Sequence, residues 1–428
     1  MSAGSSSRFR DILNALGPGL VMAGAAIGVS HLVQSTRAGA EYGYVAAVLI
    51  LAACLFKYPF LEYGPRYAAA TGESLLDGYR RLGSWATGVF GLLTVGTMFI
   101  VLAGVTAVTA GLMGWLAGTT PNLTLWSGVV LGTCIVILMW GRYQLLDRVM
   151  KVIMALLAVS TVVAAVAAVV GPSPEMVETP AGPSALLTTS GIAFSLALMG
   201  WMPVPIDMAA WHSLWTLERE RDTGTRLALR DVQADFAIGY GLSLIMALAF
   251  LVLGTAIMYG TGTEFGTSAV AFATQVVGLY NTTLGTWAGT LVGIAALTTM
   301  LSTTLAVTDA YGRLVAWFTA YLQGTPLAAR TLARAPEAVT AGSDAHPISN
   351  DPGASTSTED VTALQRYYRA GLLLTPIGAW AILALLVNSL TALVDVATTI
   401  AFLAGPVLGA MNYYLVCSDH MPEHARPS

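Results

Sequence analysis

Residues Gly17–Tyr44 read GPGLVMAGAAIGVSHLVQSTRAGAEYGY and form an apolar segment that cannot be one uninterrupted helix. The Gly-Val-Ser at 28–30 stands near its middle, and glycine, β-branched and hydroxyl residues are poor helix formers. A second apolar segment, Gly191–Trp215, is interrupted by Met-Pro-Val-Pro at 202–205, where each proline removes a backbone donor. Lipid tolerates backbone groups freed in this way only where they are buried in protein or line a cavity. Two interrupted segments in corresponding places of two halves predict the binding site of a secondary transporter.

The composition is that of a protein with many membrane spans. Of its 428 residues, 55% are hydrophobic and 10% are charged, whereas soluble domains carry about 25% charged residues. Apolar stretches long enough to cross a bilayer, roughly 20 residues each, occur at ten places: 17–38, 44–70, 86–112, 124–141, 149–171, 189–216, 233–259, 285–318, 364–387 and 389–416. The three cysteines lie far apart, in or beside these spans, so we interpret them as small hydrophobic residues.

The ten spans divide into two halves of five, and each half begins with an interrupted span. Because five is an odd number, we expect an all-α polytopic protein whose halves form an inverted repeat. Residues 319–363 are polar and rich in Ser, Thr, Pro and Gly, which predicts a disordered cytoplasmic loop. The expected parts are a cytoplasmic N-terminus (1–16), a first repeat (17–171), an external loop (172–188), a second repeat that contains the disordered loop (189–416) and a cytoplasmic tail (417–428).

The basic residues predict the orientation of the chain. Arginines gather at the ends of the spans on the side of the N-terminus, whereas the opposite side collects only Arg37 and its loops carry Glu41 and Glu175. Since positive charge favours the cytoplasmic side, we expect both termini there. The sequence therefore predicts a multi-pass protein of the plasma (inner) membrane.

Several residues at the two interruptions are functional candidates, because ionisable groups inside a membrane usually serve a function. The imidazole of His31 can bind a transition metal, or can satisfy freed backbone carbonyls. Asp207 falls in the first turn of the half-helix that Pro203 begins, where a carboxylate suits the helix dipole and can also bind a cation. Met202 is either a core filler or a sulfur ligand. Trp201 adjoins the interruption, and there it either narrows the site or packs.

Other charged residues within the spans have plainer explanations. Lys57 and Glu62 both lie in the second span, and we expect them to pair with each other or with a neighbouring span. Asp309 lies 24 residues beyond Gly285, or about 36 Å along a helix, which exceeds the ~30 Å hydrocarbon core. We therefore expect a surface ion pair between Asp309 and Arg313.

Four stretches resemble the Nramp metal-ion transporters. The first helix of that family is similar to Gly-Pro-Gly at 17–19 and Ala-Gly-Ala-Glu-Tyr-Gly-Tyr at 38–44. GRYQLLDRV at 141–149 resembles the family's entry to helix five, Met-Pro at 202–203 its helix-six motif, and LSTTL at 301–305 part of its helix eight. The resemblance covers most of the membrane region, in order. It implies the leucine-transporter fold, with helices one and six broken and alternating access around a site at the membrane midplane.

The chain departs from the family where the metal binds. The family's Asp-Pro-Gly-Asn, whose Asp and Asn bind the metal, is replaced by Gly-Val-Ser-His at 28–31, and the histidine of the helix-six motif is replaced by Val204. Met202 matches the family's sulfur ligand. The third span, 86–112, lacks the acidic residues that the family uses for proton movement. We therefore expect altered selectivity and weak or absent proton symport. The expected metal ligands are His31, Met202 and Asp207, and the expected substrate-binding residues are Gly28, Ser30, His31, Trp201, Met202, Val204 and Asp207.

The leading interpretation is a secondary transporter that moves a small cation, a divalent metal ion, by alternating access. A transporter of a small polar organic solute is the first alternative, because the usual Asp and Asn are missing. A non-transporting membrane sensor is the second, supported only by the loop 319–363. We find no nucleophile–base pair at matching depth and no nucleotide-binding motif, so we expect no enzyme, no cofactor and no nucleic-acid partner. Both transporter interpretations require residues 28–31 and 202–205 to be non-helical and to face each other.

Overall fold

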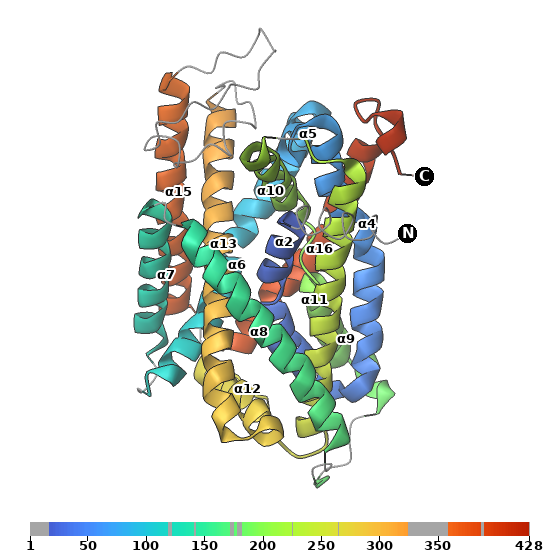
Figure 1. Cartoon of the computed structure of the whole chain (residues 1–428), viewed down its shortest axis with the longest axis vertical. Coiled ribbons are helices and arrows are strands. Elements are labelled where there is room, and N and C mark those ends of the chain that lie inside the picture. The colour runs from blue at the N-terminus through green and yellow to red at the C-terminus, as the bar shows by residue number, and fades with distance from the viewer. Residues whose placement is uncertain are drawn as a thin grey trace, which may run out of the picture.

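The computed structural model describes residues 17–118, 122–140, 143–171, 175–177, 182–224, 226–263, 265–323, 358–386 and 389–427. Every regular element in this part of the chain is a helix (Figure 1). The first half contains α2 (Pro18–Ala26), η1 (Ser30–Ser35), α3 (Thr36–Tyr42), η2 (Gly43–Ala46), α4 (Ala47–Thr71), α5 (Leu75–Leu82), α6 (Ser84–Leu116), α7 (Leu123–Trp140) and α8 (Tyr143–Val170). The second half contains η3 (Pro183–Leu187), α9 (Thr189–Trp201), α10 (Met208–Thr223), α11 (Leu229–Met258), α12 (Ala269–Leu284), α13 (Thr286–Leu322), α15 (Thr358–Leu385), α16 (Leu390–Cys417) and η5 (Glu423–Ala425).

The long helices have the length and composition of membrane spans. Within the described residues, seven segments are long and apolar enough to cross a bilayer: Ser30–Thr71, Ser84–Leu116, Leu123–Trp140, Leu229–Met258, Trp287–Leu322, Thr362–Leu385 and Leu390–Cys417. Ala155–Val170 and Thr189–Trp201 are shorter apolar helices. Large hydrophobic side chains such as Leu55, Leu92 and Val170 are exposed on the outside of this helical body, as lipid contact requires.

The first apolar segment is interrupted one residue earlier than expected. α2 ends at Ala26, Ile27 and Gly28 form a turn, and the chain resumes in η1, a π-helix. Val29, Ser30 and His31 are therefore helical, and the expectation that all of 28–31 is non-helical is wrong for these three residues. The reason is that the carbonyl of Gly28 accepts from the N–H groups of His31 (3.2 Å) and Leu32 (2.9 Å), so buried backbone groups regain partners within one turn.

The second apolar segment is interrupted where its prolines lie. α9 ends at Trp201, residues 202–207 are non-helical, and α10 begins at Met208. The Met202–Pro203 peptide bond is cis. A proline cannot donate to the helical ladder, so the chain leaves the helix here and re-enters it one turn later.

Glycines bring the first interrupted segment against α11 and the second against α16. A Cβ on Gly239 would lie 2.1 Å from the carbonyl oxygen of Gly19, and a Cβ on Gly19 would lie 2.1 Å from that of Asp235. The α2 and α11 backbones thus approach as closely as small residues permit in membrane helices. On the other segment, a Cβ on Gly200 would lie 1.8 Å from the carbonyl oxygen of Thr398, which places α9 directly on α16. The two interrupted segments are held between longer helices by these contacts.

Two regions differ from the expected connections. The loop expected over 319–363 is shorter at both ends, because α13 continues to Leu322 and α15 begins at Thr358; residues 324–357 lie outside the described part of the chain. Between the expected spans 233–259 and 285–318, the structure has the additional helix α12. The Ser268 hydroxyl caps its first turn by accepting from Ala271 N–H at 3.2 Å. Figure 1 shows α12 at the opposite end of the molecule from α5 and α10.

The two ends of the chain are described unequally. The N-terminal residues 1–16 lie outside the described residues, whereas the tail after α16 is described to residue 427. This tail folds back, because the Arg66 guanidinium on α4 donates to the carbonyl of Ala425 at 3.1 Å and Met421 is fully buried. Figure 1 shows the C-terminus at the same end as α5 and α10.

Candidate functional site at the two facing breaks

The two interruptions face each other inside the molecule. The Ser30 hydroxyl oxygen lies 3.5 Å from the carbonyl oxygen of Pro203 and 3.0 Å from that of Ala26. Ser30, Met202 and Val204 are all buried. The structure therefore brings Ser30 and residues 202–204 together across a distance of about 170 residues in sequence. Gly28 lies beside them, and a Cβ there would come within 3.0 Å of the Thr303 methyl group on α13.

His31 has both ring nitrogens engaged. Its Nδ1 lies 2.8 Å from the Ser30 hydroxyl and its Nε2 lies 2.9 Å from the carbonyl oxygen of Ser243 on α11. Since a carbonyl only accepts, we assign the proton to Nε2, and Nδ1 then faces the Ser30 hydroxyl. The ring is fully buried and both partners are uncharged, which favours the neutral form. In this conformation His31 ties η1 to α11 and has no lone pair directed at a ligand.

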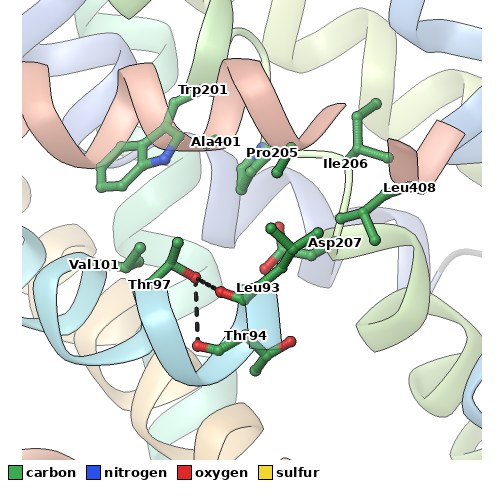
Figure 2. Close-up of a pocket in the computed structure, with 11 residues that line it drawn as sticks. Leu93, Thr94, Thr97, Val101, Trp201, Pro205, Ile206, Asp207, Ala401 and Leu408 are labelled. Carbon is green, nitrogen blue, oxygen red and sulfur yellow. Dashed lines mark hydrogen bonds between the residues drawn. The ribbon is translucent and has the colours of Figure 1, made fainter. Parts of the chain in front are cut away.

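Asp207 and Trp201 line a small cavity between α6, the second break and α16 (Figure 2). Thr94 and Thr97 of α6 face them across it, and Thr97 itself donates to the carbonyl of Leu93 at 2.8 Å. The cavity volume is about 20 Å³, room for about one water molecule. The Trp201 ring nitrogen is buried and has no partner within the described residues. The conformation is therefore closed around this part of the site.

The three expected metal ligands are not gathered into one cavity. Asp207 lines the small cavity, whereas His31 and Met202 are absent from its lining. In the described part of the chain, no group of three or more His, Cys, Asp or Glu side chains is placed to hold a metal ion. A metal held here would also need backbone carbonyls, the Met202 sulfur or a different conformation.

Lys57 is a member of the site that the sequence reasoning missed. Its ammonium donates to the carbonyl oxygens of Gly200 at 2.7 Å and Val204 at 3.2 Å, on the two sides of the second break. Of the two expected alternatives, mutual pairing of Lys57 and Glu62 is wrong, because Glu62 pairs with Arg66 at 2.7 Å. Contact with a neighbouring span is confirmed, because Lys57 reaches α9 and the second break, and Glu62 accepts from Gln233 of α11 at 3.0 Å. The sequence shows the lysine but not its partners, because any residue has a backbone carbonyl and the residue type does not indicate which carbonyls are free to accept.

A cluster of charged residues joins the helices next to the first break. Arg37 on α3 donates through Nη1 to both carboxylate oxygens of Asp395 on α16, at 3.0 and 2.8 Å, and through Nε to Glu41 at 2.7 Å. The Gln34 amide also donates to Asp395 at 3.1 Å. The Arg37 guanidinium lies 4.8 Å from the centre of the Phe194 ring on α9. These contacts join α3, α16 and α9 over the breaks.

A second set of polar contacts holds the first turn of α2. The Asp235 carboxylate on α11 accepts from the backbone N–H groups of Gly17 at 3.1 Å and Gly19 at 2.6 Å. These are donors that the first turn of a helix leaves unpaired. Asp309 and Arg313 form the expected ion pair at 2.8 Å, and Asp309 also accepts from the Tyr368 hydroxyl at 2.6 Å. The pair is not at the surface as expected, because only 18% and 15% of the two side chains are exposed.

Comparisons with known proteins agree with this arrangement. Residues 19–335 match the model of the family described as natural resistance-associated macrophage protein-like, or Nramp. An uncharacterized protein of Pasteurella multocida (strain Pm70) is 36% identical over 306 residues, which cover 70% of this chain and 69% of that protein.

Solved structures show the same fold. A crystal structure of the Eremococcus coleocola manganese transporter superposes with a TM-score of 0.66 at 13% identity, covering 99% of this chain and 83% of that one. MhsT in complex with L-phenylalanine gives a TM-score of 0.53 at 13% identity, covering 93% and 88%. Mhp1, a nucleobase-cation-symport-1 transporter, gives 0.52 at 14%, covering 94% and 78%. The fold is thus the leucine-transporter fold of an all-helical, multi-pass membrane protein, and the chain belongs to the Nramp family of membrane transporters, which are not enzymes.

Proposed function

We propose that this protein is a secondary transporter that moves a small cation, a divalent metal ion with selectivity altered from the usual Nramp pattern, by alternating access. The observation that carries the proposal is the contact between the two breaks, where Ser30 meets the Pro203 carbonyl in the buried centre. Backbone groups freed in a membrane helix are tolerated where they face protein or a cavity, and in transporters they receive the substrate.

The proposal includes ten spans in a 5+5 inverted repeat. Its first span combines α2, η1 and α3, and its sixth combines α9 and α10, so spans one and six are broken. The remaining spans are α4, α6, α7, α8, α11, α13, α15 and α16. We place both termini in the cytoplasm of a plasma (inner) membrane, because arginines predominate on that side.

Met202 and Asp207 are the proposed metal ligands at the second break. A thioether and a carboxylate suit a transition metal better than Mg²⁺, which prefers oxygen ligands and dehydrates reluctantly. His31 can join them only after it leaves Ser30 or Ser243. Gly28, Ser30, Trp201 and Val204 complete the proposed substrate-binding residues. Support for a metal also comes from the Eremococcus structure, whose protein is named a manganese transporter.

A small polar organic solute is the second candidate substrate. The observation in its favour is that a basic and an acidic side chain both adjoin the second break: Lys57 donates to the carbonyl of Val204, and Asp207 lines the small cavity. Such a site has a donor for a carboxylate and an acceptor for an amine. MhsT, of the same fold, was solved with L-phenylalanine. The sensor interpretation rests on the loop 319–363, most of which lies outside the described residues.

Transport into liposomes tests the proposal. Purified protein is reconstituted around a metal-sensitive dye, and Mn²⁺, Fe²⁺, Co²⁺ and Zn²⁺ are added in turn. We expect saturable uptake of at least one ion and its loss in Asp207→Asn. The matched control is Asp231→Asn, which removes an exposed carboxylate at the start of α11. If every ion is excluded while a radiolabelled amino acid enters, the organic solute replaces the metal as the proposed substrate.

A further inference from the structure

The second break already holds a cation, the side chain of Lys57. Its ammonium binds the carbonyl of Gly200 in the last turn of α9 and the carbonyl of Val204 in the non-helical stretch. The last carbonyls of a helix have no intrahelical partner and form the negative end of its dipole. Carbonyl and carboxylate oxygens are also the groups that ligate metal ions in proteins. Lys57 therefore occupies oxygens that a metal ion at this break could use.

The surroundings of Lys57 are mostly apolar. The side chain lies at the edge of a groove of about 600 Å³ between α4, the second break and α16. Phe56, Phe60 and Pro406 line the groove, and Lys57 and Tyr413 are the polar members of its lining. An ammonium in such surroundings is poorly solvated, so it depends on its two carbonyl partners.

The charges at the breaks sum to zero while Lys57 is in place. With Lys57 protonated and Asp207 ionised, their two charges cancel, and His31 is neutral in the hydrogen-bonding pattern described above. A divalent ion that enters beside Asp207 therefore meets a fixed positive charge, and repulsion in a low-dielectric site is strong. The first break, Gly-Val-Ser-His at 28–31, contains no carboxylate that could compensate Lys57.

We infer that Lys57 is a tethered cation that competes with the transported metal ion for the carbonyl oxygens of the second break, and so sets the affinity of the site. This inference rests on the proposed function. It assigns to Lys57 a role in specificity rather than in folding alone: the lysine keeps the affinity for divalent ions low. A neutral side chain at position 57 should bind these carbonyls more weakly than the ammonium and should not repel the ion.

Two variants of position 57 test the inference. Lys57→Gln retains an N–H donor for the carbonyls but lacks the charge, whereas Lys57→Arg retains the charge and serves as the matched control. Mn²⁺ binding is measured by calorimetry on the purified full-length proteins, and thermal melting in detergent shows that each variant is folded. We expect Lys57→Gln to bind Mn²⁺ at least roughly tenfold more tightly than the unmodified protein, and Lys57→Arg to stay near it.

The outcomes separate this inference from the proposed function. If the unmodified protein binds Mn²⁺ and folded Lys57→Gln binds it equally or more weakly, Lys57 does not compete with the ion. If the unmodified protein is silent and Lys57→Gln binds, the inference is supported. If both are silent, the competition and the metal cargo both fail. Should Lys57→Gln not fold, Lys57→Met in the same assay decides by the same criteria.

Discussion

Arg37 and Asp395 join α3 to α16 through one guanidinium nitrogen, Nη1, which lies 3.0 Å from Oδ1 and 2.8 Å from Oδ2 of the carboxylate. Both side chains are partly buried, with 16% and 33% of their surface exposed. In the proposed orientation this pair lies on the external side of the breaks. Breaking it should let water and reagents reach the residues beneath.

The first prediction is that Asp395→Asn opens this side. Thr398 lies one turn below Asp395 and is fully buried, so Thr398→Cys, in a Cys417→Ser background, reports access to a thiol reagent. We expect labelling to be roughly tenfold faster with Asp395→Asn, since hydrogen bonds to charged groups contribute about 1.5–3 kcal/mol. The control is Arg81→Ala, which removes an exposed ion pair with Glu73 elsewhere. Equal labelling rates of Thr398→Cys alone, with Asp395→Asn and with Arg81→Ala would show that the Arg37–Asp395 pair does not close the site.

The second prediction concerns the contact between α2 and α11. A Cβ on Gly239 would meet the Gly19 carbonyl oxygen at 2.1 Å, whereas a Cβ on Gly241 would meet nothing within 4 Å. Gly239→Ala should therefore destabilise the protein by about 1–3 kcal/mol through overpacking. Gly241→Ala, in the same helix, should be neutral or stabilising by about 0.5–1 kcal/mol. Thermal melting in detergent compares the two variants, and a Gly239→Ala melting temperature at or above that of Gly241→Ala contradicts the close approach.

The third prediction concerns the cap of α2. Because the Asp235 carboxylate accepts from the N–H groups of Gly17 and Gly19, Asp235→Ala should loosen the first turn of α2, with a cost of about 1 kcal/mol. Asp235→Asn keeps one acceptor oxygen and should have a smaller effect. Hydrogen exchange of the amides in residues 17–21 measures the change directly. Unaltered exchange in Asp235→Ala would mean that α2 is held by packing alone.

The fourth prediction is weak or absent proton symport of the Nramp type. α6 contains no Asp or Glu, and the second break has Val204 where the resemblance to the family leads us to expect a histidine. A pH-sensitive dye inside liposomes should report little acidification during substrate uptake. Strong acidification that persists in both His31→Ala and Asp207→Asn would reveal a proton route through other residues.

Sequence reasoning located most helices because their apolar lengths and breaking residues are local signals. The expected span 233–259 corresponds to α11 at Leu229–Met258, and the prolines at 203 and 205 mark the second break. The first break was placed one residue late, since a glycine shows that a helix can be interrupted but not how the chain resumes. α12 was missed because it is an amphipathic helix of 16 residues, too short to stand out as a span.

The site was harder to predict because its contacts join distant parts of the chain. The position of Ser30 and Met202 followed from the breaks, but the His31 contact with Ser243 depends on how α11 packs. For Lys57 the sequence led us to expect pairing with Glu62 or with a neighbouring span; its carbonyl partners could not be named, since a sequence indicates side-chain charges and not free carbonyls. The affinity of the site thus depends on a residue that lies outside both interrupted segments.

The central claim is that a metal ion binds between the two breaks, and anomalous diffraction from crystals soaked in Mn²⁺ tests it most directly. The account predicts one anomalous peak at the second break, in contact with the Asp207 carboxylate and the Met202 sulfur, that disappears in Asp207→Asn crystals. A protein saturated with Mn²⁺ whose peak lies away from residues 28–31 and 202–207, or whose peak is unchanged in Asp207→Asn, would contradict the account.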